Sequence, residues 1–351
     1  MGINARQQKI IDFAKKEENF QKKDVFFAVR KEFDVDRMTI VRDLSFLTQE
    51  NILVRTGKGR AVKYRLSKQL NLLRPVEVEK YFAKSLNDRK VMPFFNEDVF
   101  SALNDDIFTD KEINHLEKVN ERYVQTRKRL EKDSPVILRK EWERLIVELS
   151  WKSSQIEGNT YTLLETEALI KEHQMAKGKE KADAQMIINH KSTLDFILEN
   201  PTFFTVCEVN KIKKVHSFLV EGLGIKSDFR SHGVGIGGTL YRPLARQDEI
   251  AKVMKVLSET VKKINNPFSK AFVILVMLAY IQPFEDGNKR TARVVSNAIL
   301  HAHDKSMLSY RDVDVVEYKK AVLLFYEQNN LSYIKKIFME QFEFAVENYF
   351  G

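Results

Sequence analysis

Residues 271–293 read AFVILVMLAYIQPFEDGNKRTAR, an uninterrupted apolar run followed by a charged turn. The apolar run, 271–281, is typical of a helix buried at the centre of a domain. Pro283 then predicts the end of that helix, and Gly287 lets the backbone come close to a ligand. A second helix is expected to follow, through about His301.

The turn and the helix after it carry the groups that bind an oligophosphate. The free N–H groups at the start of the second helix point outward, and the helix dipole there favours negative charge. Arg290 and Arg293 lie three positions apart and add two forked cations on one helix face. Asp286 supplies an oxygen ligand of the kind that Mg²⁺ prefers. The stretch therefore predicts a site for a polyphosphate and its metal ion.

This stretch resembles the motif of the Fic family, His-Pro-Phe-x-Asp-Gly-Asn-x-Arg-x-x-Arg, at every fixed position except the first. Ser153 and Glu157, within the sequence SSQIEGN, resemble the family's inhibitory helix, expected at 138–158. Residues 233–243 (GVGIGGTLYRP) resemble its β-hairpin flap, which docks the target chain. The resemblance implies a Fic-type helical core with a β-hairpin flap. Few Gly and Pro and many Leu, Lys and Glu predict a mainly α protein, and the first seventy residues, taken up below, predict a winged-helix (α+β) domain before the core.

The resemblance also implies an activity and roles for individual residues. Such proteins move AMP from ATP to a hydroxyl of a target protein, so ATP and Mg²⁺ are the expected cofactors. Asp286 would hold Mg²⁺, and Glu157, with Ser153 on the same helix face, would inhibit by pairing with Arg293 and displacing the γ-phosphate. The residues expected to bind the nucleotide are Gly287, Asn288, Lys289, Arg290, Arg293, Ile236, Gly237, Gly238, Thr239 and, on the adenine side, Tyr318.

The departure from the motif falls on its catalytic position. Gln282 stands where the family has the histidine that takes the proton from the attacking hydroxyl, with Asn288 beside it in the catalytic set. A glutamine amide can orient a hydroxyl but cannot accept its proton, and general-base catalysis is worth about 10²–10⁴-fold. The prediction is a nucleotide pocket with impaired transfer. His216, His232 and His301 are expected to lie elsewhere, and the sequence leaves open whether Gln282 is natural or engineered.

The first seventy residues predict a separate domain. Apolar residues recur at helical spacing in three short segments, and two alternating segments with a glycine turn between them follow. The expected helices are 5–16, 24–33 and 36–50, and the expected strands are 52–56 and 61–66. Three helices followed by a hairpin make a winged helix-turn-helix.

Charge points to a polyanionic partner for this domain. Residues 1–70 contain 16 Lys or Arg and 9 Asp or Glu, an excess of +7 out of +9 for the whole chain. The third helix also resembles the recognition helix of DeoR-like regulators, which predicts double-stranded DNA as a partner. The expected DNA contacts are Arg37, Thr39, Arg42, Lys58 and Arg60. Winged helices also serve as protein-interaction or dimerisation modules, so a homodimer stays open.

The domain plan that follows is 1–70 winged helix, 71–137 helical linker or scaffold, and 138–351 Fic core with its C-terminal helices. The single cysteine, Cys207, excludes an internal disulfide and fits a reducing compartment. The start lacks a signal-peptide pattern and no apolar run reaches the ~20 residues that span a bilayer, so we expect a cytoplasmic protein without a membrane partner. Two functions stay open: a self-inhibited adenylyltransferase acting on an unidentified protein, or a DNA-binding regulator whose degraded Fic domain senses nucleotide.

Overall fold

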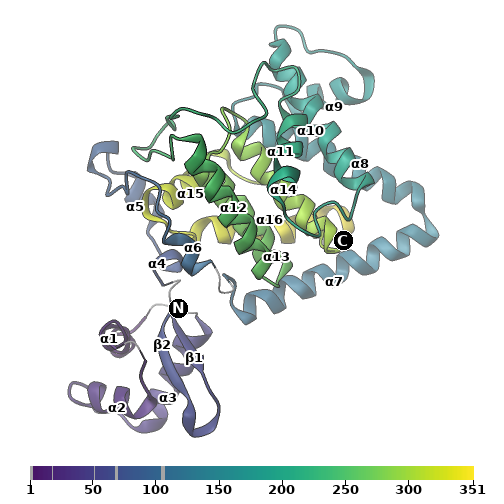
Figure 1. Cartoon of the computed structure of the whole chain (residues 1–351). Coiled ribbons are helices and arrows are strands. Elements are labelled where there is room, and N and C mark those ends of the chain that lie inside the picture. Colours follow the sequence, from purple (N-terminus) through teal and green to yellow (C-terminus); the bar gives the residue numbers. More distant parts are fainter. Residues whose placement is uncertain (1–2, 18, 51, 68–69, 104–106) are drawn as a thin grey trace. The chain divides into compact units, whose positions relative to one another are not determined.

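A computed structural model describes residues 3–17, 19–50, 52–67, 70–103 and 107–351. The chain divides into two compact units, residues 1–74 with 107–113, and residues 75–106 with 114–351. In chain order the elements of Figure 1 are α1 (Ala5–Ala14), α2 (Lys22–Arg30), α3 (Arg37–Gln49), β1 (Leu53–Thr56), β2 (Lys63–Leu66), α4 (Leu70–Leu73), α5 (Val78–Phe82), α6 (Val99–Ala102), α7 (Asp110–Asp133), α8 (Pro135–Ile156), α9 (Leu163–Glu172), α10 (Lys181–Glu199), α11 (Val209–Leu219), α12 (Gln247–Lys263), α13 (Pro267–Ile281), α14 (Asn288–Ala302), α15 (Val315–Gln328) and α16 (Ser332–Phe350). The mainly α fold predicted from the sequence is confirmed.

The N-terminal unit holds three helices followed by a hairpin, as expected. β1 and β2 pair antiparallel, with Leu53 opposite Leu66. Local capping starts the helices: the Asn4 side chain accepts from the Gln7 N–H before α1, and Asp36 accepts from the Thr39 N–H before α3. Helices α1 and α3 therefore begin where the sequence supplies an oxygen for the first free N–H groups.

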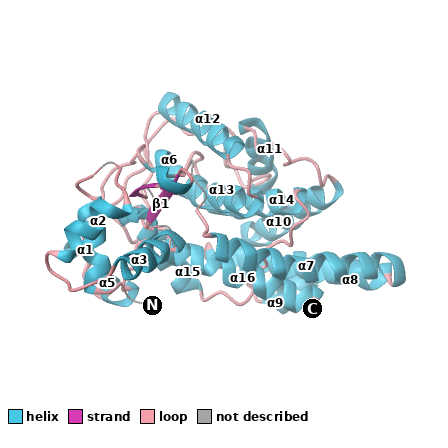
Figure 2. Cartoon of the chain, turned by 90° about the horizontal axis from the view of Figure 1, so that it is seen from below, coloured by secondary structure: helices cyan, strands magenta, loops and turns pink. Residues whose placement is uncertain are grey.

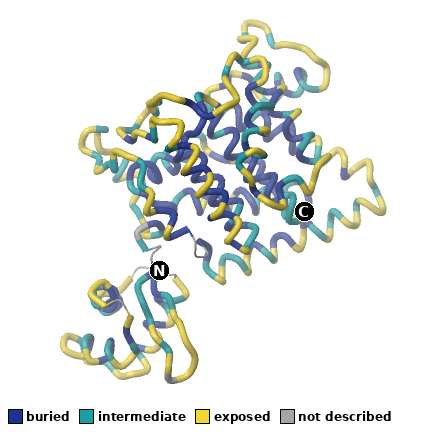
Figure 3. The backbone as a smooth tube through the Cα atoms, in the orientation of Figure 1, coloured by how far each residue is buried: buried dark blue, intermediate teal, exposed yellow. Residues whose placement is uncertain are grey.

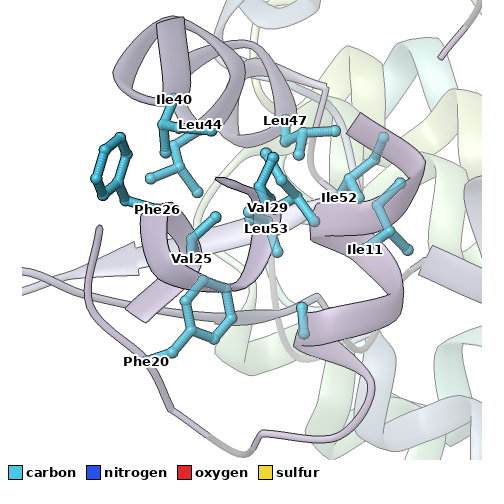
Figure 4. Packing of buried hydrophobic residues seen from close by; sticks show 12 residues of the cluster. Ile11, Phe20, Val25, Phe26, Val29, Ile40, Leu44, Leu47, Ile52 and Leu53 are labelled. Atoms are coloured by element: carbon cyan, nitrogen blue, oxygen red, sulfur yellow. The ribbon is translucent and has the colours of Figure 1, made fainter. Parts of the chain in front are cut away.

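A small apolar core holds these elements together (Figure 4). The helices and the hairpin turn their buried faces toward one another, and the cluster is built from aliphatic and phenylalanine side chains. Its buried members are Ile10, Ile11, Ala14, Phe20, Val25, Phe26, Val29, Ile40, Leu44, Leu47, Ile52 and Leu53. Arg6 and the buried Asp43 form an ion pair that ties α1 to α3. The unit thus has a core of its own.

The larger unit is organised around α13 and α14, which pack on each other. Every residue of 271–281 is buried, as the unbroken apolar run predicted, and Figure 3 shows the dark blue core through this region. Asn266 caps α13, and Pro267 occupies its first turn, where its missing N–H costs nothing. The two helices place the turn between them, 282–287, against the core of the unit.

Helix α8 runs from Pro135 to Ile156, so it begins three residues before the predicted start at 138. Glu157 is its C-cap, and Gly158, with φ +101°, follows at the predicted end. A positive φ is costly for any residue with a Cβ, so glycine suits this helix end. Helix α8 packs against α9, α10 and α16, which puts Glu157 at the edge of the same core.

Two expectations about irregular segments were wrong. Residues 233–243 form no hairpin and run as a loop, pink in Figure 2, because their backbone pairs with a distant segment: the Arg242 N–H donates to the Pro93 carbonyl at 2.8 Å. The region 71–137 is not helical throughout, since 83–98 holds only a short 3₁₀ turn, Leu86–Asp88. Its backbone also bonds outward, the Met92 N–H donating to the Glu327 carbonyl at 2.8 Å.

Among the residues that the structure describes, no helix combines the length and apolar character needed to cross a bilayer. Cys207 is buried, and its burial raises the pKa of the thiol to about 12, as expected of a packing residue.

Candidate functional site

The turn between α13 and α14 is held in one conformation by its own side chains. Helix α13 ends at Gln282, which adopts a left-handed conformation with φ +51° and ψ +58°. Asn288 then clips the turn: its Oδ1 accepts from the Phe284 N–H at 2.8 Å and its Nδ2 donates to the Phe284 carbonyl at 2.9 Å. Gly287, with φ +76°, completes the turn as the N-cap of α14. No described side chain caps the first N–H groups of α14, and such groups at a helix N-terminus suit an anion.

The two arginines of α14 are buried beneath this turn. Arg290 is 1% exposed, and its Nη2 lies 3.4 Å from Asp286 Oδ2. Burial lowers the pKa of Arg290. Arg293 is 0% exposed and donates to Ser153, from Nε to the hydroxyl at 2.9 Å and from Nη2 to the carbonyl at 2.8 Å. A buried cation needs an anion, and each arginine has a carboxylate nearby.

Glu157 is the anion beside Arg293. Its Oε1 lies 2.9 Å from Arg293 Nη2, and its Oε2 accepts from Lys289 Nζ at 3.1 Å. Burial works to raise the pKa of Glu157, but Arg293 and Lys289 outweigh it and the net shift is downward. Glu157 therefore stays ionised. The pairing of Glu157 with Arg293, expected from the resemblance, is present, and Lys289 is a second partner that the sequence did not indicate.

A cavity of about 240 Å³ opens next to this ion pair. Four of the predicted nucleotide-binding residues are at or beside it: Ile236, Gly237, Lys289 and Tyr318 line its wall. The sequence reasoning missed the other lining residues, Ile156, Lys319, Val322, Leu323 and Tyr326. The four on α15 recur with Tyr318 at helical spacing, the pattern that could have identified them, whereas Ile156 comes from the end of α8.

Two flap residues stand apart from the cavity wall. Thr239 turns its hydroxyl to its own loop, where Oγ1 accepts from the Tyr241 N–H at 3.1 Å. Gly238 has φ +82°, and a Cβ built on it would lie 3.5 Å from Leu323 of the cavity wall. Its carbonyl accepts from Arg89 Nη2 at 2.8 Å. Gly238 and Thr239 are thus bonded elsewhere and are not among the residues that line the cavity.

Gln282 is buried and bonded inside the protein. Its Nε2 donates to the Ala279 carbonyl at 2.6 Å and to the phenol oxygen of Tyr326 at 3.3 Å. The backbone carbonyl of Gln282 accepts from Arg230 Nε at 2.7 Å. Arg230, 1% exposed, also donates its backbone N–H to the Pro283 carbonyl at 3.1 Å. Gln282 is thus held by the Ala279 carbonyl of its own helix and by the side chains of Tyr326 and Arg230.

The expectation that all the histidines lie elsewhere was wrong for His216. Its ring stacks on Phe284 with centroids 3.6 Å apart, and its Nε2 lies 2.9 Å from the Asp286 carbonyl. Burial lowers the pKa of His216, so the ring is neutral at neutral pH. His216 supports the turn from below. This contact could not be predicted from the sequence, because α11 and the turn are distant along the chain.

Asp286 is the one predicted metal ligand. Its side chain is 68% exposed. Within the described ranges no group of three or more His, Cys, Asp or Glu side chains gathers to hold a metal ion. A single carboxylate at the phosphate turn still fits Mg²⁺, which is usually bound through one or two carboxylates together with substrate phosphates.

The residues predicted to contact DNA lie on the surface of the N-terminal unit. Arg37 and Arg42 on α3 and Lys58 at the hairpin tip are exposed, and Thr39 is half-buried. The side chain of Arg60 lies outside the described part of the structure. Met38, 58% exposed, is on the same helix as the two arginines.

Comparison with known proteins identifies the region around the turn. Residues 206–300 match the Fic/DOC family. The chain is 28% identical over 161 residues to the protein adenylyltransferase Fic of Nematostella vectensis, an alignment that covers 43% of this chain. The chain spans about a third of the length of that relative (36%).

Solved structures share the fold. A Fic domain containing signaling protein from Bacteroides thetaiotaomicron superposes with a TM-score of 0.56 at 19% identity, covering 68% of this chain and 95% of that one. Fic-1 from C. elegans superposes with a TM-score of 0.55 at 17% identity, covering 72% and 80%. A Fic family protein from Desulfovibrio desulfuricans superposes with a TM-score of 0.54 at 19% identity, covering 73% and 75%.

Proposed function

Because residues 206–300 form a Fic/DOC domain, we propose that the chain binds Mg·ATP at the turn between α13 and α14 and is held in a self-inhibited state by Glu157. The observation that carries this proposal is the Glu157–Arg293 pair, 2.9 Å apart, at a helix N-terminus equipped for phosphates. The activity that goes with such a site is AMP transfer to a protein hydroxyl. We therefore propose a self-inhibited adenylyltransferase as the first candidate function.

The phosphates are assigned to the start of α14. Its free N–H groups, the Gly287 turn and Arg290 receive the α- and β-phosphates, and Arg293 receives the γ-phosphate. A divalent cation bound by Asp286 would neutralise part of the phosphate charge. The adenosine end is assigned to the 240 Å³ cavity, where Tyr318 and Tyr326 provide aromatic surface and Ile236 covers the flap side.

Glu157 inhibits by pairing with Arg293, the residue that the γ-phosphate would otherwise contact. Arg293 is fully buried and already paired, so a γ-phosphate has to compete with a carboxylate that is held by Lys289 as well. Ser153 fixes the Arg293 side chain from behind through two hydrogen bonds. ATP then binds without its third phosphate properly placed. Removing Glu157 frees both cations for the nucleotide.

Transfer itself needs a base at position 282. In the reaction the target hydroxyl oxygen bonds to the α-phosphorus, the bond to the bridging oxygen of pyrophosphate breaks, and the hydroxyl proton must leave. An amide cannot take that proton near neutral pH, and the Gln282 amide donates to the Ala279 carbonyl instead. Binding does not depend on this step. The chain as it stands is therefore proposed to bind nucleotide with little or no transfer.

Calorimetry with Mg·ATP tests the binding proposal. The unmodified chain, Glu157→Gly and Glu157→Gly with Arg293→Ala are titrated under one condition. We expect Glu157→Gly to bind at least about tenfold more tightly than the unmodified chain, since one charge-assisted contact is worth about 1.5–3 kcal/mol. The Arg293→Ala variant should lose that gain. No heat with Glu157→Gly, in a variant that unfolds cooperatively, would overturn the proposal.

A second function, DNA binding, is favoured by the surface of the N-terminal unit. Arg37, Arg42 and Lys58 are exposed, and none of them forms an ion pair with another described residue, while Arg6 and Lys9 on α1 are paired. Unpaired cations on one helix and a hairpin tip suit phosphates and a major groove. The regulator reading, in which nucleotide binding alters DNA binding, rests on this surface.

Binding to mixed-sequence duplex DNA across a salt series tests this second function. Phosphate contacts release counterions, so affinity should fall steeply with salt, and Arg42→Ala should reduce the slope. Lys9→Ala, which removes a cation already paired with Glu32, is the matched control and should leave the slope nearly unchanged. Binding that does not change with salt would exclude a phosphate-contacting surface, and self-association without DNA binding would favour the dimerisation reading.

A further inference from the structure

The segment 78–96, here called the connector, belongs to the larger unit. It contacts segments that line the proposed nucleotide cavity. Arg89 is the centre of these contacts. Its Nη1 lies 3.1 Å from Glu327 Oε1 on α15, in a pair whose side chains are 8% and 0% exposed. Its Nη2 donates to the Gly238 carbonyl of the flap loop at 2.8 Å. One guanidinium thus joins three segments that are far apart in the sequence.

Glu327 makes two further contacts with the segment 78–96. Its Oε2 accepts from the phenol of Tyr81 at 2.7 Å, and its backbone carbonyl accepts from the Met92 N–H at 2.8 Å. The pair is shielded from water, so breaking it would leave a buried charge without a partner. The contact is therefore costly to break. Arg89 is also held in place by the Phe82 ring, with the guanidinium carbon 5.2 Å from the ring centroid.

The flap loop depends on the connector for its position. It forms no hairpin with itself, and the Arg242 N–H donates to the Pro93 carbonyl at 2.8 Å. Ile236 and Gly237, immediately before the Gly238 carbonyl that Arg89 holds, line the cavity. The opposite wall is α15, the helix that carries Glu327. The same guanidinium therefore fixes the loop on one side of the cavity to the helix on the other.

We propose that Arg89 is a positioning residue of the nucleotide site: its fork spans Glu327 and the Gly238 carbonyl and holds the flap loop closed over the cavity. Arg89 does not touch the cavity, so its effect is on the shape of the wall. This inference rests on the proposed nucleotide site. A lysine at this position can keep the ion pair with Glu327 but cannot make both contacts in a fixed plane.

The chain offers a matched control in the pair Lys320–Glu79. Lys320 Nζ lies 2.7 Å from Glu79 Oε1, so this pair also joins the connector to α15, but it makes no contact with the flap loop and Glu79 is 78% exposed. Helix α5 packs on α15 at this point (Figure 1). Glu79→Gln therefore removes a connector–α15 ion pair while leaving the flap contact intact.

The experiment combines two measurements on Arg89→Ala, Arg89→Lys and Glu79→Gln, each placed on the full-length Glu157→Gly chain. Mg·ATP affinity is measured by calorimetry, and amide hydrogen exchange is followed in 234–242. We expect Arg89→Ala and Arg89→Lys to bind at least about tenfold more weakly, the scale of one charge-assisted hydrogen bond, and to exchange faster in 234–242. Glu79→Gln should match its parent in both.

The outcomes separate this inference from the proposed function. If the Glu157→Gly parent gives no heat with Mg·ATP, the nucleotide site itself fails, and the exchange measurement still reports on Arg89. If the parent binds and Arg89→Lys binds equally well with unchanged exchange in 234–242, the positioning role is overturned. If Arg89→Ala unfolds, Arg89→Lys decides alone, because it retains a cation for Glu327.

Discussion

The Gln282 side chain donates from Nε2 to the carbonyl oxygen of Ala279 at 2.6 Å, so the residue at the catalytic position is bonded back onto the helix that it ends. Its amide hydrogen is already used inside the protein. Proton transfer at this position is thus limited by the residue type and by its orientation, while the turn proposed to bind phosphate keeps its glycine and both arginines.

Replacing Gln282 by histidine is expected to create transfer activity. An imidazole can accept the hydroxyl proton, and the gain from a general base is about 10²–10⁴-fold. Incubation with α-labelled ATP, Mg²⁺ and cell lysate should label protein with Gln282→His, and more strongly when Glu157→Gly is added. Gln282→Asn, another amide, is the control and should stay unlabelled. Strong labelling by the unmodified chain would contradict the role given to Gln282.

Removing Glu157 is expected to lower stability while raising nucleotide affinity. The change leaves Arg293 buried without its carboxylate, which costs about 3 kcal/mol, although both hydrogen bonds to Ser153 remain. Mg·ATP at a concentration of about a hundred times its Kd should raise the free energy of unfolding of the variant by about 2.7 kcal/mol. Urea unfolding of Glu157→Gly with and without Mg·ATP measures both. An unfolding free energy equal to that of the unmodified chain would mean that the ion pair contributes nothing to stability.

Replacing Gly287 by alanine is expected to damage the turn directly. Gly287 has φ +76°, and a Cβ there would lie 3.2 Å from Val220 Cγ1 and 3.5 Å from Arg290 Nη2. The left-handed conformation costs about 1–2 kcal/mol in a residue with a side chain. Gly235→Ala is the control, because a Cβ there meets no atom within 4 Å. Thermal unfolding and Mg·ATP affinity should both fall for Gly287→Ala and change little for Gly235→Ala.

His301 is expected to weaken the fold as the pH falls. Burial, with a smaller contribution from Arg127, lowers the pKa of His301 from 6.5 to about 4. The unfolded chain therefore binds a proton between pH 6.5 and 4 that the folded chain does not, so stability is lost as the pH falls through this window. The full loss is about 3 kcal/mol.

A comparison of unfolding free energies at pH 7.5 and pH 4.5 checks this, using the unmodified chain and His301→Gln. From pH 7.5 to pH 4.5, the unfolding free energy of the unmodified chain should fall by more than that of His301→Gln. A parallel pH dependence would show that His301 titrates normally. The ring packs against Trp142 of α8 with centroids 5.6 Å apart.

The amino-acid sequence by itself determined the local features of this protein. The apolar run of α13, the turn at Gly287, the Asp36 cap of α3 and the end of α8 at Gly158 all follow from residues close together in the chain, where spacing and backbone preference act directly. The candidate phosphate site was predictable for the same reason, since its turn and both arginines belong to one short stretch.

Only the tertiary structure decided which distant residues contact these local features. Lys289 as a second partner of Glu157, His216 beneath the turn and Arg89 between α15 and the flap loop each join segments that are distant in sequence. The flap was expected as a hairpin because its sequence resembles the family's flap, yet the Arg242 N–H donates to the Pro93 carbonyl. Spacing along a chain specifies which faces and turns form, but the choice among distant partners depends on how those faces pack, and packing belongs to the whole fold.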